Sequence, residues 1–469
     1  RLAGKILTSI KLTAERGSSP LAIAGDFTFD ASNGSWEQSC SGSNTITLSW
    51  TQGVVLNQSF TCYMNLFPTL RVGDMITIEL VTADYTARVT APCKANFIKE
   101  NIYNFPLAID DYSGLTILDD EGNYCYGTFT CAALNVDGLP SLINSEGPGA
   151  SGTTSLGQIA NTVGWDFFAV SEDFEYHSQL SSALTNYNMG SYRGSINITQ
   201  LVTQANTDGL EFFWKKNEVI AENETMVEFT AKKGDLTHGA NETIKKGFRH
   251  YVVTVAQGVV IDVYITHMNT YEGSGNTEET NDYVAAVLSQ LRQMRDYVLA
   301  NAKTNNRPAI IMGDSNMRYT RHKICDNFID YINNNVSGEY AGYTVVDPWV
   351  KCNRNNVYPT WNTKSLMIRS KFAGDTDYDI VCSDDQRGEV VDKMWYINVP
   401  SAPIQIEAIS CENDVAHFTK STESASYSGV TAEDASGNIL TNQTVSYTKN
   451  IGYADHFPVV TKFRYTRTE

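Results

Sequence analysis

The sequence has no long hydrophobic run, no closely spaced cysteine pair and few clustered cations, and each absence excludes a class of protein. No stretch of 18 apolar residues occurs in the 469-residue chain, so no segment is predicted to span a membrane. The nine cysteines include no Cys-x-x-Cys pair, which argues against a zinc knuckle. Most are interpreted as buried apolar residues, and one or two disulfides remain an alternative.

Positive charge is scarce, because 35 Lys and Arg stand against 53 Asp and Glu for a net charge of −18. Residues 1–117 carry 8 Lys and Arg against 10 Asp and Glu, net −2, and the remainder carries 27 against 43, net −16. Lys and Arg cluster only as pairs in the second part, at 215–216, 232–233 and 245–246. Because nucleic-acid binding depends on clustered cations, nucleic acid is the less favoured partner. Part of the acidic excess is suited to hold cations.

Length and patterning predict two domains, residues 1–117 and 118–469. In the first, short alternating segments rich in Thr, Val and Ile are separated by turn residues, with no helical periodicity. They predict an all-β sandwich. The predicted strands are 45–50, 59–68, 75–83 and 86–91, and 104–114 is interpreted as a last strand and linker.

After residue 124, strands alternate with a few helices. The clearest helix is predicted over 280–303, where apolar residues recur at spacings of three and four. Mixed strands with few helices predict an α+β domain of two packed sheets. Strands are expected at 126–136, 166–172, 309–312, 388–397 and 457–465, helices at 155–165 and near 322–334, and a strand-bearing insertion or long loops at 398–450.

The stretch RPAIIMGDSNMRYTR (307–321) suggests a site. The apolar run 309–312 is typical of a buried strand, and it leads into Gly313, Asp314, Ser315 and Asn316. Two residues apart on an extended backbone lie on the same side, so Asp314 and Asn316 are predicted to face one point.

Other strands end in polar residues too. A single strand-terminal Asn or Asp is more often a turn residue, and a single His is more often a structural hydrogen-bonding group. Several such ends in one domain would provide carboxylates for a hard cation, two imidazoles for proton transfer and amide donors for an oxyanion. Besides Asp314 and Asn316, the residues are Asn135, Glu172, His267, Asp392, Asp455 and His456.

This ordered set resembles the endonuclease/exonuclease/phosphatase superfamily, which includes deoxyribonuclease I-like and sphingomyelinase-like proteins. The resemblance spans roughly residues 120–466, and its most specific parts are GDSN (313–316) and ADHFPV (454–459). It implies a four-layered α/β sandwich that cleaves phosphoesters with Mg²⁺ or another divalent cation such as Mn²⁺ or Ca²⁺. Residues 1–117 resemble, more weakly, the β-sandwich modules of fimbrillin-like surface lipoproteins.

The resemblance also implies roles for the residues around the metal. Glu172 would bind the metal, Asn135 would help order the metal or the substrate phosphate, and Asp455 would reach the metal. Asp314 would orient or deprotonate the attacking water. Whether Asp314 or a histidine is the base stays open, and so does the number of metals.

On the phosphate side, the resemblance implies that His267 and Asn316 contact the phosphoryl oxygens. His456 would be the second imidazole, with Asp392 as its carboxylate partner, preferred over Asp379 because VVDKMWYIN continues as a strand.

Three further residues or groups are weaker candidates. Asp208 would lie opposite His267, and Arg318 would bind a substrate phosphate, with a solvated loop as the alternative for Arg318. Asp173 and His177 would line the site or belong to a loop beside Glu172.

The predicted function is metal-dependent hydrolysis of a small-molecule or lipid phosphoester, as a phosphodiesterase or a phosphatase. A secreted nuclease is disfavoured by the acidic charge, and a non-catalytic surface binding protein is disfavoured by the complete set of polar ends. The resemblance of residues 1–117 leads us to expect a secreted or cell-surface protein, with a lipid anchor as one alternative.

Overall fold

The chain divides into two compact units, Arg1–Thr128 and Phe129–Glu469, in the computed structural model. The division falls inside strand β9 (Tyr124–Asn135) and later than residue 117, because β8 (Leu115–Asp119) pairs with β7 (Tyr85–Pro92). The structure describes residues 2, 4–25, 27–30, 35–38, 42–56, 61–98, 101–103, 115–196, 206–235, 238, 240–270, 272–273, 275, 277–319, 322–359, 380–382, 389–433 and 439–468.

The first unit is all-β, as predicted, and is built on an antiparallel sheet with the order β5-β1-β6-β7-β8. Alternate residues of β1, from Leu7 and Ile10 to Ala14, are buried on one face of this sheet. Besides β7 and β8, whose bounds are given above, the strands of the unit are β1 (Ile6–Arg16), β2 (Ser19–Pro20), β3 (Phe27–Asp30), β4 (Ser35–Gln38), β5 (Thr45–Val55) and β6 (Met75–Thr82).

The strand predicted over 59–68 is wrong for the part that the structure describes, because residues 61–68 form no strand. Cys62, Met64 and Leu66 nevertheless pack against the apolar face of the sheet. The alternation of apolar residues in the sequence therefore identified which side of this extended segment is buried. It did not identify whether the backbone of the segment is hydrogen-bonded into a sheet. Among the described residues this segment covers the sheet in place of a hydrogen-bonded second layer.

The second unit contains two mixed sheets, with the strand orders β11-β12-β10-β9-β23-β20 and β13-β14-β15-β16-β19-β17. The parallel pairs include β9 with β10 in the first sheet and β15 with β16 in the second. The strands are β10 (Phe167–Ser171), β11 (Tyr187–Met189), β12 (Glu211–Lys215), β13 (Ile220–Glu228), β14 (Gly247–Ala256), β15 (Val259–His267), β16 (Ala309–Asp314), β17 (Thr344–Val346), β19 (Asp392–Asn398), β20 (Ile404–Asn413) and β23 (Val459–Arg467).

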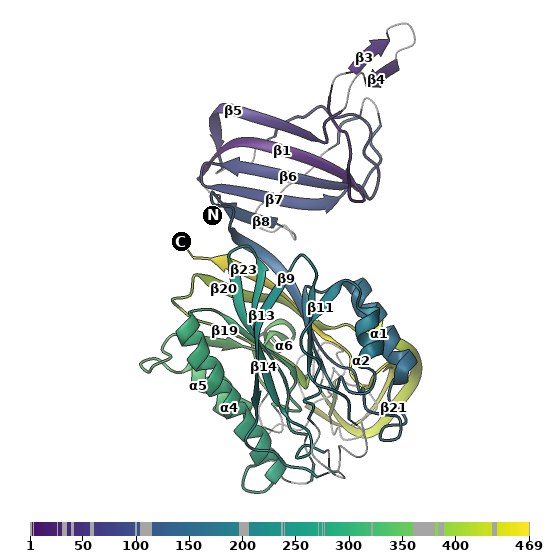
Figure 1. The fold of residues 1–469 in the computed structure, drawn as a ribbon, viewed down its shortest axis with the longest axis vertical. Helices are drawn as coiled ribbons and strands as arrows, with labels where there is room; N and C mark the ends of the chain where they lie inside the picture. Colours follow the sequence, from purple (N-terminus) through teal and green to yellow (C-terminus); the bar gives the residue numbers. More distant parts are fainter. Residues whose placement is uncertain are drawn as a thin grey trace. The chain divides into compact units, whose positions relative to one another are not determined.

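Helices cover the outer face of each sheet (Figure 1). Leu156 of α1 packs with Phe168 of β10, and Leu291 of α4 packs with Ile311 of β16. The helices are α1 (Gly149–Val163) and α2 (His177–Ala183) on the first sheet and α4 (Asp282–Asn305), the π-helical turn η1 (Cys325–Ile329) and α5 (Asp330–Asn333) on the second. Two shorter helices are α6 (Pro348–Asn353) and α7 (Val415–Phe418).

The inner faces of the two sheets pack against each other. Cys131 Sγ of β9 lies 3.8 Å from Met394 Sδ of β19. The rings of Phe212 on β12 and Tyr251 on β14 stack with centroids 4.7 Å apart. The order of layers is therefore helix, sheet, sheet, helix, and the predicted four-layered α/β sandwich is confirmed.

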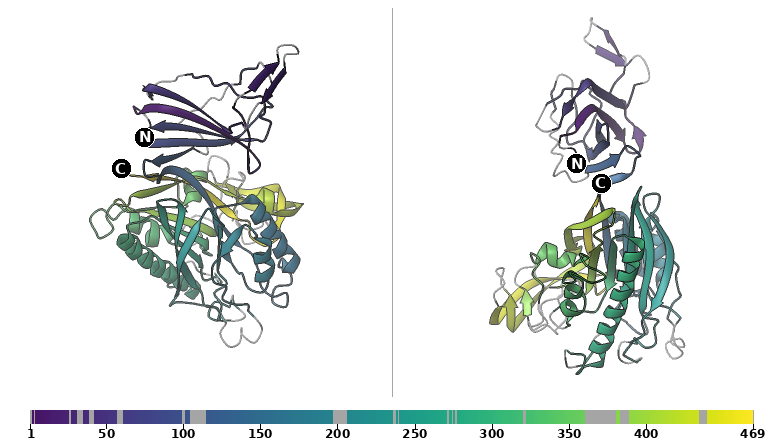
Figure 2. Two further views of the ribbon diagram at one scale, coloured as in Figure 1. Left: turned by 45° about the horizontal axis from the view of Figure 1, so that its top comes forward. Right: turned by 90° about the vertical axis from the view of Figure 1, so that its left-hand side faces the viewer.

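Strands or long loops were predicted for the region 398–450. This region contains the strand β20 and most of a long hairpin. The hairpin consists of β21 (Thr419–Glu433) and β22 (Ile439–Gly452), and β18 (Ile380–Cys382) pairs parallel to β21. Figure 2 shows this hairpin projecting to one side of the two sheets.

Seven cysteines whose side chains the structure describes are free thiols: Cys62, Cys93, Cys125, Cys131, Cys325, Cys352 and Cys411. Burial raises the pKa of the thiols of Cys131 and Cys411 well above the usual value, so both behave as small apolar residues. Among the described residues, no helix has both the length and the apolar character needed to cross a membrane.

Candidate active site

Gly313 allows β16 to lie close enough to β15 for the site to form. It pairs with Thr266 in the parallel ladder, and its φ is +137°. A Cβ at this position would lie 2.0 Å from the Thr266 carbonyl oxygen, so only glycine fits. The same register places His267 directly beside Asp314 at the ends of the two strands.

The turn after Asp314 is not the extended segment that the sequence predicted. Asn316 adopts a left-handed conformation with φ +52°, and its backbone N–H donates to Asp314 Oδ1 at 2.8 Å. Its side-chain Nδ2 donates to the Met268 carbonyl at 3.1 Å. The inference that the two side chains share one side of an extended strand is therefore wrong, because an Asn side chain tolerates the left-handed turn. The turn holds Asn316 against the residue that follows His267.

Ser315 connects this turn to β19. Its backbone N–H and its hydroxyl donate to the Val391 carbonyl at 2.9 and 2.8 Å, and its Oγ accepts from the Met317 N–H. Since Val391 precedes Asp392, the buried serine fixes Asp314 relative to Asp392.

The first sheet contributes Asn135 and Glu172. Asn135 is the last residue of β9, and Glu172 directly follows Ser171, the last residue of the parallel strand β10. Ser171 pairs with Asn135 in this ladder, so Asn135 and Glu172 lie at the same end of the two strands. Asn135 Nδ2 donates to Glu172 Oε1 at 2.9 Å and to Asp314 Oδ2 at 3.1 Å. One buried carboxamide therefore connects carboxylates from both sheets. Glu172 has φ +60°, an unfavourable conformation for a non-glycine residue that commonly marks functional positions.

Two imidazoles flank Asp314. His267 Nε2 lies 3.8 Å from both Asp314 Oδ2 and Glu172 Oε1. His456 Nε2 lies 3.9 Å from the same Asp314 oxygen. The side chains of His267, Asp314 and His456 are at most 5% exposed, whereas that of Glu172 is 21% exposed and opens the cluster to solvent.

His456 is held by Asp392. His456 Nδ1 lies 2.6 Å from Asp392 Oδ2, and both side chains are buried. Asp455 is 44% exposed, and its Oδ1 lies 3.7 Å from His456 Nε2. The alternative partner, Asp379, lies outside the described residues.

Carboxylates crowd this end of the unit. Burial, together with the charges of Asp455 and Asp314, raises the pKa of Glu172, although the hydrogen bond from Asn135 opposes the shift. Burial and the charges of Asp455 and Glu172 raise the pKa of Asp137 to about 7. Such crowding favours a bound cation, because a cation stabilises the ionised carboxylates.

Lys246 is a further residue of this region that no sequence pattern indicates, and it is 2% exposed. Its Nζ donates to the Met268 carbonyl at 2.9 Å, the group that also accepts from Asn316. Burial lowers its pKa to about 8, while Glu172 and Asp314 oppose that shift. In the sequence the Lys-Lys pair at 245–246 is only one of three such pairs, and the burial of one member depends on tertiary packing.

The weaker candidates make contacts outside the set of residues described so far. Asp208 is buried and accepts from Arg249 through both oxygens, at 2.7 and 2.8 Å, so its carboxylate is already engaged. Arg318 is only 6% exposed, which does not fit a solvated loop, and its backbone N–H donates to His322. Asp173 pairs with His177 at 2.5 Å.

Three sets of side chains place potential metal ligands within 4.8 Å of one another in the described part of the chain. Two share Asp314 and lie in the cluster described above: Glu172 with His267 and Asp314, and Asp314 with Asp392 and His456. The third, Asp173 with His177 and Glu211, is buried nearby, behind the Glu172 loop.

No protein-family model matches this chain, and no curated protein sequence matches it significantly. Similar solved structures include an endonuclease/exonuclease/phosphatase family protein from Bacteroides thetaiotaomicron, with 12% identity, TM-score 0.44 and coverage of 73% of this chain and 100% of that chain. Sphingomyelinase C from Streptomyces griseocarneus has 13% identity, TM-score 0.44 and coverage of 71% and 99%. TDP2 from C. elegans has 13% identity, TM-score 0.39 and coverage of 72% and 75%. At these values the similarities assign neither a substrate nor a reaction, and the fimbrillin-like character of residues 1–117 stays a prediction.

Proposed function

We propose that the second unit is a metal-dependent phosphoester hydrolase whose catalytic centre is the cluster around Asp314. The proposal rests on the side chains that come together in this cluster. Glu172 and Asn135, from one sheet, lie together with His267, Asp314 and the Asp392–His456 pair. Phosphoryl transfer requires mainly placement and charge stabilisation, and this cluster offers both.

The donor set fits a hard divalent cation. Glu172 and Asp314 present carboxylate oxygens, and Asn135 holds both carboxylates through its Nδ2 while its own oxygen accepts from the Asp137 N–H. Mg²⁺ is bound in proteins by one or two carboxylates with waters completing its shell. Asp455 is near enough to join the set. When bound, the metal would neutralise charge on the phosphoryl oxygens. Burial first, and then the nearby carboxylates Asp455 and Asp314, raise the pKa of Glu172, and a bound cation would offset both effects.

The protein groups would divide the remaining work. Asp314, between two imidazoles, would orient the attacking water and accept its proton. His267 and one amide hydrogen of Asn316 would donate to phosphoryl oxygens. Asp392 would keep the His456 ring oriented and stabilise its protonated form, so that Nε2 faces the reacting group.

A small-molecule or lipid phosphoester is the substrate class we favour over nucleic acid, because residues 118–469 carry a net charge of −16, from 27 Lys and Arg against 43 Asp and Glu. We also propose a secreted or cell-surface location, which rests on the resemblance of residues 1–117 to surface modules.

The test is hydrolysis of a generic phosphodiester and a generic phosphomonoester, each with Mg²⁺ and with EDTA. We expect one ester to be turned over with Mg²⁺ and not with EDTA, which would also separate diesterase from phosphatase. Turnover that is equal in EDTA would contradict the metal-dependent mechanism. Absence of turnover of either ester, and of a lipid phosphodiester, would contradict the enzyme itself.

A further inference from the structure

Lys246 carries a buried positive charge that the mechanism above does not use. The residue is 2% exposed, as is His456, so it is no more enclosed than the proposed catalytic groups. An ammonium has three N–H donors. Among the described residues, the Met268 carbonyl is the one hydrogen-bond acceptor of Lys246 Nζ, and no carboxylate forms an ion pair with it. A buried cation with a single neutral acceptor is costly, so an anionic ligand would stabilise it.

The Lys246 ammonium shares its acceptor with the side chain of Asn316. The Met268 carbonyl, next in the chain to His267, accepts from Lys246 Nζ at 2.9 Å and from Asn316 Nδ2 at 3.1 Å. The Met268 N–H donates to the Asp314 carbonyl at 2.9 Å, which holds this segment at the centre of the cluster. Because both nitrogens bond one oxygen, they are no more than about 6 Å apart. A phosphoryl group beside Met268 can therefore accept from both.

The charges that act on Lys246 belong to the carboxylates proposed to hold the metal. Burial lowers the pKa of Lys246, and the charges of Glu172 and Asp314 oppose this shift. With a divalent cation on these carboxylates, Lys246 would lose their attraction and face a like charge. With a phosphoryl dianion beside both positive charges, Lys246 would regain a counter-charge. Lys246 therefore makes metal binding and anion binding depend on each other.

A purely structural role for Lys246 is the alternative. Its hydrogen bond links the residue before β14 to the residue after β15. A neutral donor would make the same link without the cost of burying an ammonium. A structural link would also act in the same way with and without a bound metal, whereas a charge that meets a phosphoryl group acts differently in the two states. The two roles therefore lead to different experimental results.

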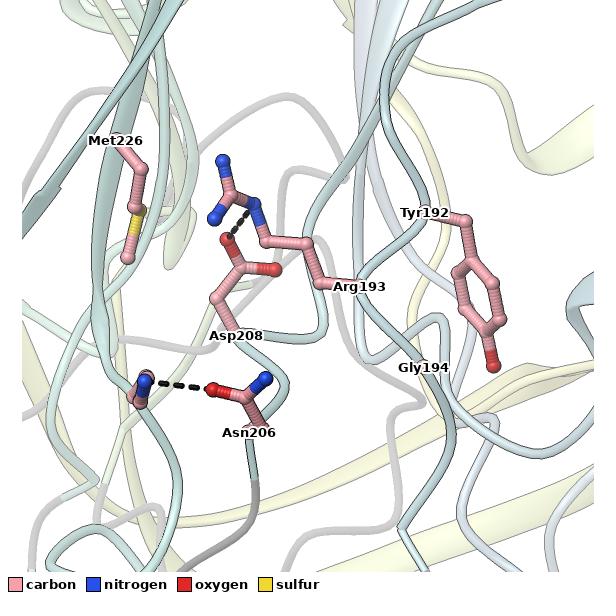
Figure 3. A pocket seen from close by; sticks show the side chains of 7 residues that line it. Tyr192, Arg193, Gly194, Asn206, Asp208 and Met226 are labelled. Atoms are coloured by element: carbon pink, nitrogen blue, oxygen red, sulfur yellow. Dashed lines mark hydrogen bonds and ion pairs between the residues drawn. The ribbon is translucent and has the colours of Figure 1, made fainter.

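The neighbouring Lys245 has the same side chain in a different environment. It is exposed, and its Nζ donates to Asn206 Oδ1 at 2.6 Å. It lines an open pocket of about 420 Å³, which Figure 3 shows with Asn206 and with the Arg193–Asp208 ion pair at 3.6 Å. Lys245 is therefore the matched control for Lys246, because its substitution removes a positive charge one residue away that already has a side-chain acceptor.

We propose that Lys246 binds the phosphoryl group of the substrate and couples the binding of this anion to the binding of the metal. The inference rests on the proposed hydrolase function and adds a residue that contacts the substrate. Lys246 is then a fixed positive charge beside the metal. It donates to a phosphoryl oxygen together with Asn316, and it takes no part in holding the metal.

The test is isothermal titration calorimetry with two probes, Mg²⁺ alone and inorganic phosphate at saturating Mg²⁺. The proteins are wild type, Lys246→Met and Lys245→Met. We expect Lys246→Met to weaken phosphate binding at least tenfold, because the anion loses a charged donor. We expect the same variant to bind Mg²⁺ without phosphate at least as tightly as wild type, because a repelling charge is gone. Lys245→Met should match wild type in both titrations.

Phosphate affinity of Lys246→Met within threefold of wild type would overturn the proposal, and so would the absence of phosphate binding to wild type. A loss of Mg²⁺ affinity equal to the loss of phosphate affinity would also overturn it, because that result indicates a structural link. If Lys246→Met fails to fold, Lys246→Gln takes its place, since an amide can donate to the Met268 carbonyl without carrying charge. The same outcomes then decide.

Hydrolysis of the preferred ester separates this inference from the hydrolase function. If wild type turns over no ester but binds phosphate with Mg²⁺, and Lys246→Met binds it at least tenfold more weakly, the hydrolase proposal fails and Lys246 stands as a phosphate-binding residue. If wild type hydrolyses an ester with Mg²⁺ and Lys246→Met retains its kcat and KM, the Lys246 assignment fails and the hydrolase stands.

Discussion

His456 Nδ1 and Asp392 Oδ2 lie 2.6 Å apart although the two residues are separated by 64 positions in the sequence. The pair is buried and its outer nitrogen faces Asp314. A second pair in the same unit, His417 with Asp414 at 2.7 Å, has similar contact geometry, but its histidine is 63% exposed. The two pairs therefore provide a matched comparison between a proposed catalytic dyad and a surface ion pair.

Asp392→Asn should lower kcat by roughly 10²–10³-fold, because the neutral amide no longer stabilises a protonated His456. The measurement is steady-state hydrolysis of the preferred ester at saturating Mg²⁺. Asp414→Asn should leave kcat within twofold. Equal effects of the two substitutions would show that the buried pair has only a structural role.

Glu172→Gln should weaken binding of Mn²⁺ or Mg²⁺ at least tenfold, because it removes the exposed carboxylate of the metal donor set. Isothermal titration calorimetry of the substrate-free protein gives the dissociation constant directly. Glu175→Gln is the control, since Glu175 lies in the same loop, is exposed and accepts from Ser195. Retention of wild-type affinity by Glu172→Gln would remove Glu172 from the metal site.

Gly313→Ala should destabilise the second unit by about 3 kcal/mol or more, because the new methyl group would overlap the Thr266 carbonyl. Gly149→Ala is the control, because it measures the cost of a side chain at a positive φ without this overlap. Its φ is +59° and no atom lies within 4 Å of its added Cβ, so about 1 kcal/mol is expected. Denaturant unfolding of both variants gives the two values. Similar losses would mean that β15 and β16 can separate to accept a side chain.

Glu211 should make the protein less stable as pH rises. Burial raises its pKa from 4.5 to about 7, against the opposing charge of Arg249. The folded state then holds a proton that the unfolded state has lost, so the free energy of unfolding falls between about pH 4.5 and 7. Glu211→Gln removes this dependence, and its stability relative to wild type should increase by roughly 3 kcal/mol from pH 5 to pH 8.

Glu218→Gln controls for this measurement, because Glu218 is near the end of the same strand and its side chain is 62% exposed. Its stability relative to wild type should be the same at both pH values. If Glu211→Gln behaved in the same way, a buried protonated Glu211 would be excluded.

The meeting of Asn135 with Glu172 and of His267 with Asp314 could be anticipated from sequence because of strand geometry. Each residue follows a strongly apolar run, and neighbouring parallel strands bring their carboxyl ends to the same edge of a sheet. The identity of the pairs is visible in the register, where Ser171 lies opposite Asn135 and His267 opposite Asp314.

Other features depended on contacts that local pattern does not encode. Asn316 was expected on an extended strand, but the side chain of Asp314 and the Met268 carbonyl stabilise a left-handed turn instead. Asp208 was expected opposite His267, but it pairs with Arg249, 41 residues away. These contacts form because the packing of the two sheets buries the polar side chains together. The local sequence shows the charge of each residue but not its partner.

The central claim is that the Asp314 cluster is one metal-dependent catalytic centre. The most direct test is the kcat of wild type, His456→Ala and His417→Ala on the preferred phosphoester, each at saturating Mg²⁺ and in EDTA. The account predicts metal-dependent turnover that falls by roughly 10²–10⁴-fold in His456→Ala and stays at the wild-type level in His417→Ala. Turnover by His456→Ala equal to that of His417→Ala would contradict it.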